Sequence, residues 1–331
     1  MELQEGYDLK PARRTYSRVG WALSAVIGAT FLISLAMEIV IQILSRLGLI
    51  STASTLLYWL RITVPLYLAI IVGLLILRSL PAAKPEKAKL GAKNFFVFIP
   101  ICFFLSYSGN IFGNLMSGLL SGGEAENAVA ELAMDTSFFK VLYMVILAPL
   151  VEEFVFRKQI IDRTVRYGEK AAVLFSAITF GLFHGNMFQF PYAFLLGWVF
   201  AYIYVRTGKL RFPVIYHFMI NFMGAVVSPF VLSLTDAEAV AAMEAAETEA
   251  EYMAAYAKAL PGMIGNMLFT WFVLFMFVLG LILLILRCKR LVWKQREEQM
   301  PKGKSFSTVY INAGVIVFTL LCIGQFVLAL L

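Results

Sequence analysis

Residues 264–286 read IGNMLFTWFVLFMFVLGLILLIL and contain no Asp, Glu, Lys or Arg. A helix rises about 1.5 Å per residue, so about 20 apolar residues cross the hydrocarbon core of a bilayer. This stretch therefore predicts a transmembrane helix. The whole chain has the same character, because 60% of its 331 residues are hydrophobic and only 15% are charged. That apolar share exceeds the share in soluble domains, so the sequence predicts a polytopic membrane protein.

Nine stretches are long and apolar enough to span a membrane, some of them only just. They are residues 20–44, 62–77, 95–120, 138–161, 171–187, 190–205, 212–234, 264–286 and 310–331. We therefore expect an all-α, polytopic transmembrane helix bundle of about nine spans, with eight possible, in which a core of four helices carries the site.

The loops between these stretches differ in charge. Lys and Arg gather at the N-terminus and in four connections, whereas the other connections are short or acidic. The basic connections are residues 78–93, 157–170, 206–211 and 287–304. Cytoplasmic loops are enriched in Lys and Arg. Nine spans in a cell membrane, with the N-terminus cytoplasmic and the C-terminus extracytoplasmic, would place every basic loop on the cytoplasmic face.

The same pattern suggests four parts of the chain. Residues 1–134 are expected to form N-terminal transmembrane helices, and residues 135–234 a catalytic core. Residues 235–263 are expected to form an acidic, Ala-rich extracytoplasmic connector, within which 235–258 is predicted to be a solvent-exposed helix or, alternatively, a plain polar connector. Residues 264–331 form C-terminal transmembrane helices.

Two classes of function find no support in the composition. The net charge of +7 could suggest nucleic acid, but in a membrane chain Lys and Arg report topology first, and we expect no nucleic-acid partner. The three cysteines form no CxxC pair, so they predict neither a disulfide framework nor a thiolate metal site.

The segment Ala148-Pro-Leu-Val-Glu-Glu-Phe-Val-Phe-Arg157 places charges in apolar surroundings. Residues four apart share a helix face, so Glu153 and Arg157 can pair, whereas Glu152 is turned by about 100° and can point elsewhere. A free carboxylate in an apolar site can act as a general base. The three charges could also be an interfacial cluster at the inner end of the helix.

Only two histidines occur, and both lie in apolar stretches. Phe180 and His184 lie one turn apart, as do His217 and Asn221. Each histidine alone could be a hydrogen-bonded packing residue. Intramembrane ionisable groups are costly, however, and usually functional.

Three helices could therefore bring Glu152, His184, His217 and Asn221 together. Such a set could activate water and stabilise an oxyanion, or Glu152, His184 and His217 could hold a divalent metal such as zinc. No HExxH signature is present, and no cofactor is certain.

Straight, parallel helices would put these side chains at different depths. From the basic loops, Glu152 would lie about 15 Å away, His184 about 20 Å and His217 about 8 Å. Convergence requires helix tilt, a bend at Pro149, or a buried loop beside Lys170.

At these residues the chain resembles the CAAX protease and bacteriocin-processing enzyme family of intramembrane endopeptidases. The segment 148–157 is similar to the family's EExxxR motif, Phe180 to His184 to its FxxxH motif, and His217 to Asn221 to its HxxxN motif. Residues 206–213 also resemble the family's segment before the last histidine.

The resemblance implies hydrolysis of a peptide bond within or near the lipid bilayer. It implies that Glu152 is the general base, that His184 helps to activate water, and that His217 and Asn221 stabilise the oxyanion. Glu153, Arg157 and Phe180 would organise the site. Family members are often called metalloproteases, but a metal-free glutamate mechanism is also proposed for them.

The expected substrate is a membrane-embedded or lipidated peptide or protein, of the CAAX type or of the kind processed by bacterial relatives. Two other classes of function remain open. One is a non-catalytic membrane scaffold, or a regulator of a sensor kinase or an immunity protein. The other is a proton-coupled transporter, although the sequence shows no internal repeat of the kind many transporters have.

Overall fold

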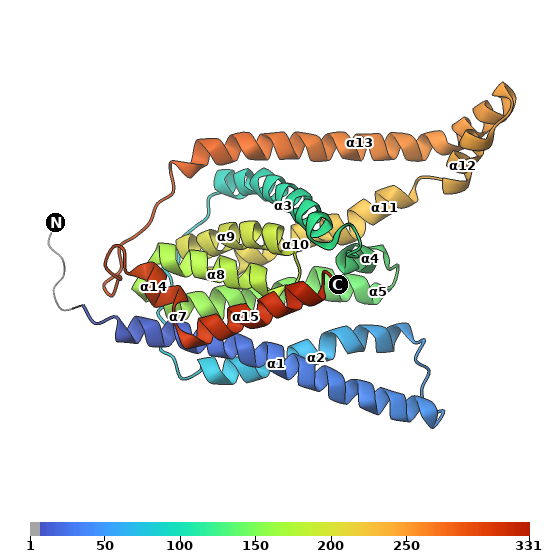
Figure 1. Ribbon diagram of the computed structural model, residues 1–331. Coiled ribbons are helices and arrows are strands. Elements are labelled where there is room, and N and C mark those ends of the chain that lie inside the picture. Colours follow the sequence, from blue (N-terminus) through green and yellow to red (C-terminus); the bar gives the residue numbers. More distant parts are fainter. Residues whose placement is uncertain (1–6) are drawn as a thin grey trace.

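The computed structural model describes residues 7–331, and Figure 1 shows them as a bundle of helices. No strand occurs in that range. The expected all-α fold is therefore confirmed.

Long helices surround a centre of shorter ones. Five helical segments are long and apolar enough to cross a membrane, as judged by length and composition. They are α1 (Lys10–Arg46), α2 (Thr55–Leu77), α3 (Ala92–Ser121), the run Arg211–Ser233 and α13 (Glu249–Cys288). The helix α15 (Ala313–Leu328) is apolar but shorter. The chain is a multi-pass membrane protein, and each of the nine predicted stretches is largely helical.

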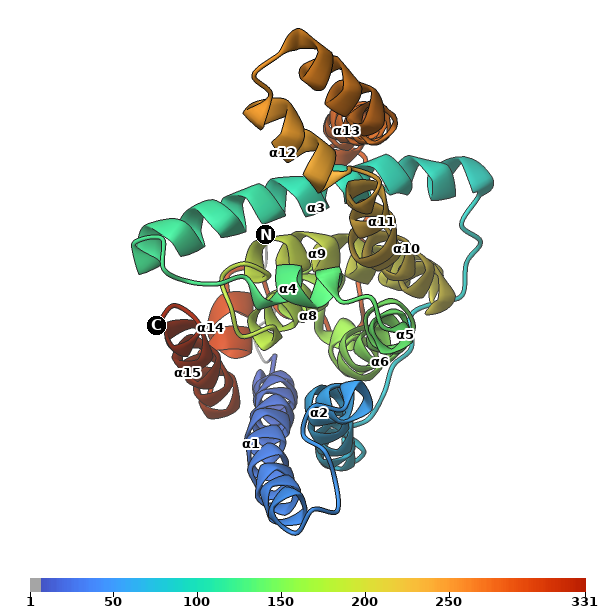
Figure 2. The same cartoon turned by 90° about the vertical axis from the view of Figure 1, so that its right-hand side faces the viewer.

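The central helices follow one another in the chain. They are α8 (Glu169–Phe183), α9 (Phe190–Thr207) and α10 (Arg211–Phe222), the last continued by η4 (Met223–Val227) and α11 (Ser228–Ser233). In Figure 2, α1 and α2 lie together on one side of this centre, whereas α3 and α13 lie on the other. The helix α15 packs against α1. The centre is therefore enclosed by helices from both ends of the chain.

The predicted span 138–161 is not one regular α-helix. It consists of α5 (Phe138–Lys140), η1 (Val141–Leu147), α6 (Ala148–Glu153) and η2 (Phe154–Ile161), where η1 and η2 are π-helical. Pro149 lies at the start of α6, where its missing N–H and fixed φ favour a change of helical register. The π-helical turns are wider than α-helical turns and often occur at functional sites.

The connection after this helix is buried. The helix continues into α7 (Asp162–Thr164) and the 3-10 turn η3 (Val165–Tyr167), and most residues from 162 to 169 are inaccessible to solvent. The buried loop beside Lys170 that convergence of the site could require is therefore present. Because α8 begins inside the protein, His184 at its far end need not lie as deep as a straight span would place it.

The connector is organised differently from the expectation. The 235–258 segment forms two helices rather than one, because α12 (Ala237–Ala245) ends before a break and α13 begins at Glu249. The Thr248 side chain accepts the Glu251 N–H, and the Glu251 side chain in turn accepts the Thr248 N–H. This capping box starts a 40-residue helix that continues through the predicted span 264–286.

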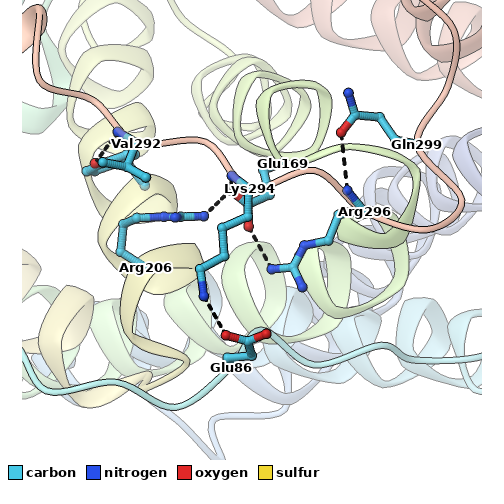
Figure 3. A network of polar contacts seen from close by, with 8 residues as sticks. Glu86, Glu169, Arg206, Val292, Lys294, Arg296 and Gln299 are labelled. Atoms are coloured by element: carbon cyan, nitrogen blue, oxygen red, sulfur yellow. Dashed lines mark hydrogen bonds and ion pairs between the residues drawn. The ribbon is translucent and has the colours of Figure 1, made fainter.

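The basic loops meet at one end of the bundle, which we call the basic end and which comprises residues 78–91 and 289–304. Glu169, the first residue of α8, accepts hydrogen bonds from Arg206, from Arg296 Nη2 at 2.7 Å and from the Lys294 backbone N–H at 2.8 Å (Figure 3). Lys294 also pairs with Glu86 of the other loop. A carboxylate at a helix N-terminus is favoured by the helix dipole. Glu169 therefore ties the loop 289–304 to the central helices, and Lys294 joins this loop to the other.

Candidate active site

The predicted site residues lie on three neighbouring elements. Glu152, Glu153 and Arg157 lie on α6 and η2, Phe180 on α8 with His184 as its C-cap, and His217 and Asn221 on α10. The elements α8 and η2 are in contact, as are α10 and α6.

A buried ion pair lies at the centre of the site. Glu153 and Arg157 are both 0% exposed, and Arg157 Nε lies 2.8 Å from Glu153 Oε2 while Nη2 donates to Oε1 at 3.2 Å. The i, i+4 pairing predicted from the sequence is confirmed. Arg157 Nη1 also donates to Ser176 Oγ at 3.1 Å, and the guanidinium lies 4.6 Å from the Phe180 ring centroid. A buried charge is tolerated when it is paired and hydrogen-bonded in this way, so the Glu153 carboxylate is held in one place.

His217 lies between the two neighbouring carboxylates. Its Nδ1 is 3.0 Å from Glu153 Oε1, and its Nε2 is 3.7 Å from Glu152 Oε2. The ring also stacks on Phe200, with centroids 5.5 Å apart. Because Glu153 is held by Arg157, it acts as the acceptor, and Nδ1 of His217 carries the proton that it donates. Nε2 therefore faces Glu152.

Glu152 points away from the ion pair, as its place on the helix predicts. Its side chain is 26% exposed, whereas that of Glu153 is 0% exposed. It lines a cavity of about 560 Å³, including the open mouth, which lies between the α6–η2 helix and the pair α1 and α2. Apart from Glu152, the polar groups in the lining are the hydroxyls of Tyr67 and Tyr143. Glu152 is therefore the carboxylate that a molecule in this cavity would meet.

His184 is fixed by the end of its own helix. Its Nδ1 lies 2.8 Å from the Phe180 carbonyl oxygen, so Nδ1 carries the donated proton and Nε2 is left as an acceptor. Gly185 follows with φ of 68°, a left-handed conformation that favours glycine. The Phe180 ring lies edge-on to both histidines, with centroids 4.9 Å from His184 and 5.9 Å from His217. Phe180 therefore separates and orients the two imidazoles.

Asn221 has a different contact from the one expected for an oxyanion donor. Its Nδ2 donates to the Met144 carbonyl oxygen at 2.7 Å. In the π-helical register the donor to that carbonyl would be the N–H of residue 149, which is proline and has none. Asn221 supplies the missing donor and so joins α10 to the helix that carries Glu152.

A metal ion would need at least three side-chain ligands close to one another. Across residues 7–331, no group of three His, Cys, Asp or Glu side chains is arranged to hold a metal ion. The set Glu152, His184 and His217 offers chemically suitable donors for zinc, but as these side chains lie they do not form a three-ligand group.

Two contributors to the site were not predicted. Ser176 on α8 accepts from Arg157 and donates to the Phe156 carbonyl at 2.9 Å, and Tyr67 of α2 lines the Glu152 cavity. Ser176 lies four residues before Phe180 and eight before His184, so helical spacing alone could have placed it on the same face. No comparable sequence pattern marks Tyr67.

Comparisons with known proteins concern the same segment. Residues 134–223 match the family described as "Type II CAAX prenyl endopeptidase Rce1-like". A Bacillus subtilis (strain 168) protein named "Putative membrane peptidase YdiL" is 28% identical over 160 residues. That match covers 46% of this chain and 64% of the relative. No solved structure matches. These matches support the resemblance of residues 134–223 to the CAAX protease and bacteriocin-processing enzyme family.

Proposed function

We propose that the protein is an intramembrane endopeptidase that hydrolyses a peptide bond in a membrane-embedded or lipidated peptide or protein. The observation that carries the proposal is the position of His217 between a buried, arginine-paired Glu153 and a partly exposed Glu152. The family match and the relative named as a membrane peptidase support the same class of reaction.

The proposed reaction uses Glu152 as the general base. Glu152 accepts a proton from water, and the water oxygen attacks the carbonyl carbon of the substrate. Nε2 of His184, the acceptor left free by the Phe180 carbonyl, orients that water. Glu152 then returns the proton to the leaving nitrogen, the oxyanion re-forms the carbonyl as the C–N bond breaks, and the products are a carboxylic acid and an amine.

The oxyanion formed by the attack needs a hydrogen-bond donor. His217 can provide one when its Nε2 also carries a proton, because its Nδ1 proton remains on the ring and is donated to Glu153. Asn221 acts here as a positioning residue through Met144, in place of the oxyanion role that the resemblance implies. We propose a glutamate mechanism without a tightly bound metal, supported by this hydrogen-bond arrangement.

The experiment compares purified full chain with Glu152→Gln and His184→Ala in liposomes. A pooled library of membrane peptides is digested with and without a chelator and read by mass spectrometry. Loss of a positioned general base lowers rates by about 10²- to 10⁴-fold, so cleavage should fall by that amount in Glu152→Gln. The control Glu244→Gln removes an exposed carboxylate of α12 and should cleave as the wild type does.

Three results would count against the proposal. Cleavage that is abolished by chelator and restored by zinc would replace the glutamate mechanism with a metal mechanism. Cleavage that persists in Glu152→Gln would remove the assigned base. No cleavage by the wild type, with full cellular function in a Glu152→Gln strain, would favour the scaffold or regulator instead.

We also propose that the basic end faces the cytoplasm, because its two Lys- and Arg-rich loops would then obey the charge bias of membrane proteins. Cys288 at the end of α13 is exposed, whereas Cys102 and Cys322 are buried. A membrane-impermeant maleimide should therefore label Cys288 in inverted vesicles and not in right-side-out vesicles. Labelling in the opposite preparation would reverse the orientation, and Cys288→Ser is the control for labelling at other positions.

A further inference from the structure

The cavity beside Glu152 is built largely by helices outside the family-matched segment. Its walls include Ala22, Leu23 and Val26 of α1 and Leu66, Ile70, Gly73, Leu74 and Leu77 of α2. The α2 residues recur every three or four positions, so they form one continuous helix face. Val26, Ala22 and Leu77 are almost completely buried between helices. The walls are therefore preformed, and most of the lining is apolar.

Tyr67 gives this cavity a second polar feature. Its hydroxyl is buried and has no hydrogen-bond partner among residues 7–331. Leaving a buried hydroxyl unpaired destabilises a folded protein. The hydroxyl belongs to the lining of the cavity that also exposes Glu152. A molecule that brings a carbonyl group into the cavity would accept a hydrogen bond from the Tyr67 hydroxyl.

We propose that α1 and α2 form a substrate-specificity subsite, in which the cavity takes a bulky apolar side chain next to the scissile bond and Tyr67 donates a hydrogen bond to a nearby substrate carbonyl. This inference rests on the proposed protease function. The occupant is a peptide with a large aliphatic or aromatic residue, because the lining is apolar except for Glu152, Tyr67 and Tyr143. The substrate backbone must lie near Glu152 if its carbonyl is attacked there.

The side-chain preference tests the cavity. A peptide cleaved by the wild type is remade with Ala, Leu or Phe on either side of the scissile bond, and kcat/KM is measured for each. The wild type should prefer Leu or Phe over Ala at one of these positions. Ile70→Phe fills the cavity and should lower that preference by about tenfold or more. The large substrate side chain then finds no room in the cavity, so its apolar surface is no longer buried there. The control Ile71→Phe makes the same change on the lipid-facing side of α2, where residue 71 is 52% exposed, and should keep the wild-type preference.

The hydroxyl is tested separately by Tyr67→Phe. This variant should lower kcat/KM by about tenfold for the Ala, Leu and Phe peptides alike, as loss of one hydrogen bond to a substrate predicts. Its Tm should equal or exceed that of the wild type, because an unpaired buried hydroxyl has been removed. Tyr216→Phe is the matched control, since that hydroxyl donates to the Phe95 carbonyl at 2.8 Å and its loss should lower the Tm.

The outcomes separate this inference from the proposed function. If the wild type cleaves, Glu152→Gln does not, and Ile70→Phe keeps the wild-type preference, the subsite is wrong and the protease stands. A lower Tm for Tyr67→Phe with unchanged kcat/KM would show that its hydroxyl is structural and would overturn its substrate contact. If the wild type cleaves no peptide, the protease and the subsite both fail.

Discussion

The central helices and α13 lie in the same membrane environment but differ in which side chains they bury. In α13 only Ala259, Gly262 and Gly280 are buried among 40 residues. In α8, nine of 15 residues are buried, and they include Glu169, Ser176 and Thr179. Backbone groups are satisfied within each helix in both cases, so the difference lies in the side chains. The helix α13 exposes an apolar surface suited to lipid, whereas the central helices bury polar groups against one another.

The helix with strong hydropathy is therefore not a helix that carries the candidate site. Strong hydropathy marks α13 as a span but assigns it no chemical role. The helices that carry Glu152, His184 and His217 are shorter or irregular, and of these only the run beginning at Arg211 meets the length and hydropathy criteria for a span. Polar groups reduce the apolar character of a helix, and they persist in a membrane where a partner or a function requires them. Two of the three helical segments that carry the candidate site therefore do not qualify as spans by length and composition.

The largest effect is expected when the Glu153–Arg157 ion pair is broken. Arg157→Met leaves the Glu153 carboxylate buried without its cation, which should lower the free energy of unfolding by about 3–5 kcal/mol. Thermal unfolding in detergent measures the change as a lower Tm. Cleavage should also be lost, because Glu153 would no longer hold the Nδ1 proton of His217 in place.

The matched control is an exposed ion pair of α13. Lys258 on α13 pairs with Asp236 at 3.0 Å, but its side chain is 60% exposed. Exposed pairs contribute little, so Lys258→Met should leave the Tm unchanged. Equal Tm shifts in the two variants would show that burial does not distinguish the two regions.

Helical spacing predicted part of the site correctly. The i, i+4 relation placed Arg157 on Glu153 and turned Glu152 away, as the structure has them. The order of the three motifs indicated that their helices meet. The π-helical segments were not predicted, and at η1 the register is accompanied by a tertiary contact, the hydrogen bond from Asn221 to Met144, that helical spacing does not reveal. Tyr67 was missed because its significance comes from the cavity that four separate parts of the chain enclose.

Local signals also explain the misjudged connector. The sequence Thr248-Glu-Ala-Glu251 is a capping box, which marks the start of a helix. Treating residues 235–258 as one helix overlooked this signal. The acidic composition indicated exposure to solvent, but it did not fix the helix boundary.

A second prediction concerns Glu169, whose contacts hold residues 289–304 on the central helices. Glu169→Gln removes the carboxylate that holds Arg206, Arg296 and the Lys294 backbone. We expect the free energy of unfolding to fall by about 2–3 kcal/mol, because a buried charged acceptor is lost. Hydrogen exchange of residues 289–304, which link α13 to the central helices, should become faster.

Glu86→Gln is the control for this junction. Glu86 pairs with Lys294 at the protein surface, with its side chain 69% exposed. This variant should leave the exchange of residues 289–304 nearly unchanged. If it accelerates exchange as much as Glu169→Gln does, the loop is held by surface pairing rather than by the buried carboxylate.

A third prediction concerns the contact of α13 with its neighbour. A Cβ at residue 280 would lie 2.0 Å from the Pro100 carbonyl oxygen of α3, so Gly280→Val should force the helices apart. Overpacking of this kind costs about 1–3 kcal/mol, seen as a lower Tm. Gly28→Val on α1 is the control, because no atom lies within 4 Å of a Cβ there. A stable Gly280→Val protein would show that α13 does not depend on this close approach.

The smallest effect concerns pH at the exposed end of the α12–α13 hairpin. Asp236 accepts the Ala239 N–H at 2.8 Å and pairs with Lys258, and these contacts hold the pKa of its carboxyl below the usual 3.8. A carboxyl whose pKa is lower in the folded state stabilises the fold above its unfolded pKa, and that contribution is lost as pH falls through the folded pKa. Hydrogen exchange of Ala237–Ala245, corrected for its intrinsic pH dependence, should therefore be constant from pH 7 to 5 and increase only below about pH 4. Asp236→Asn should remove the acid-dependent step, and a loss of protection already between pH 7 and 5 would assign the cap to a group other than Asp236.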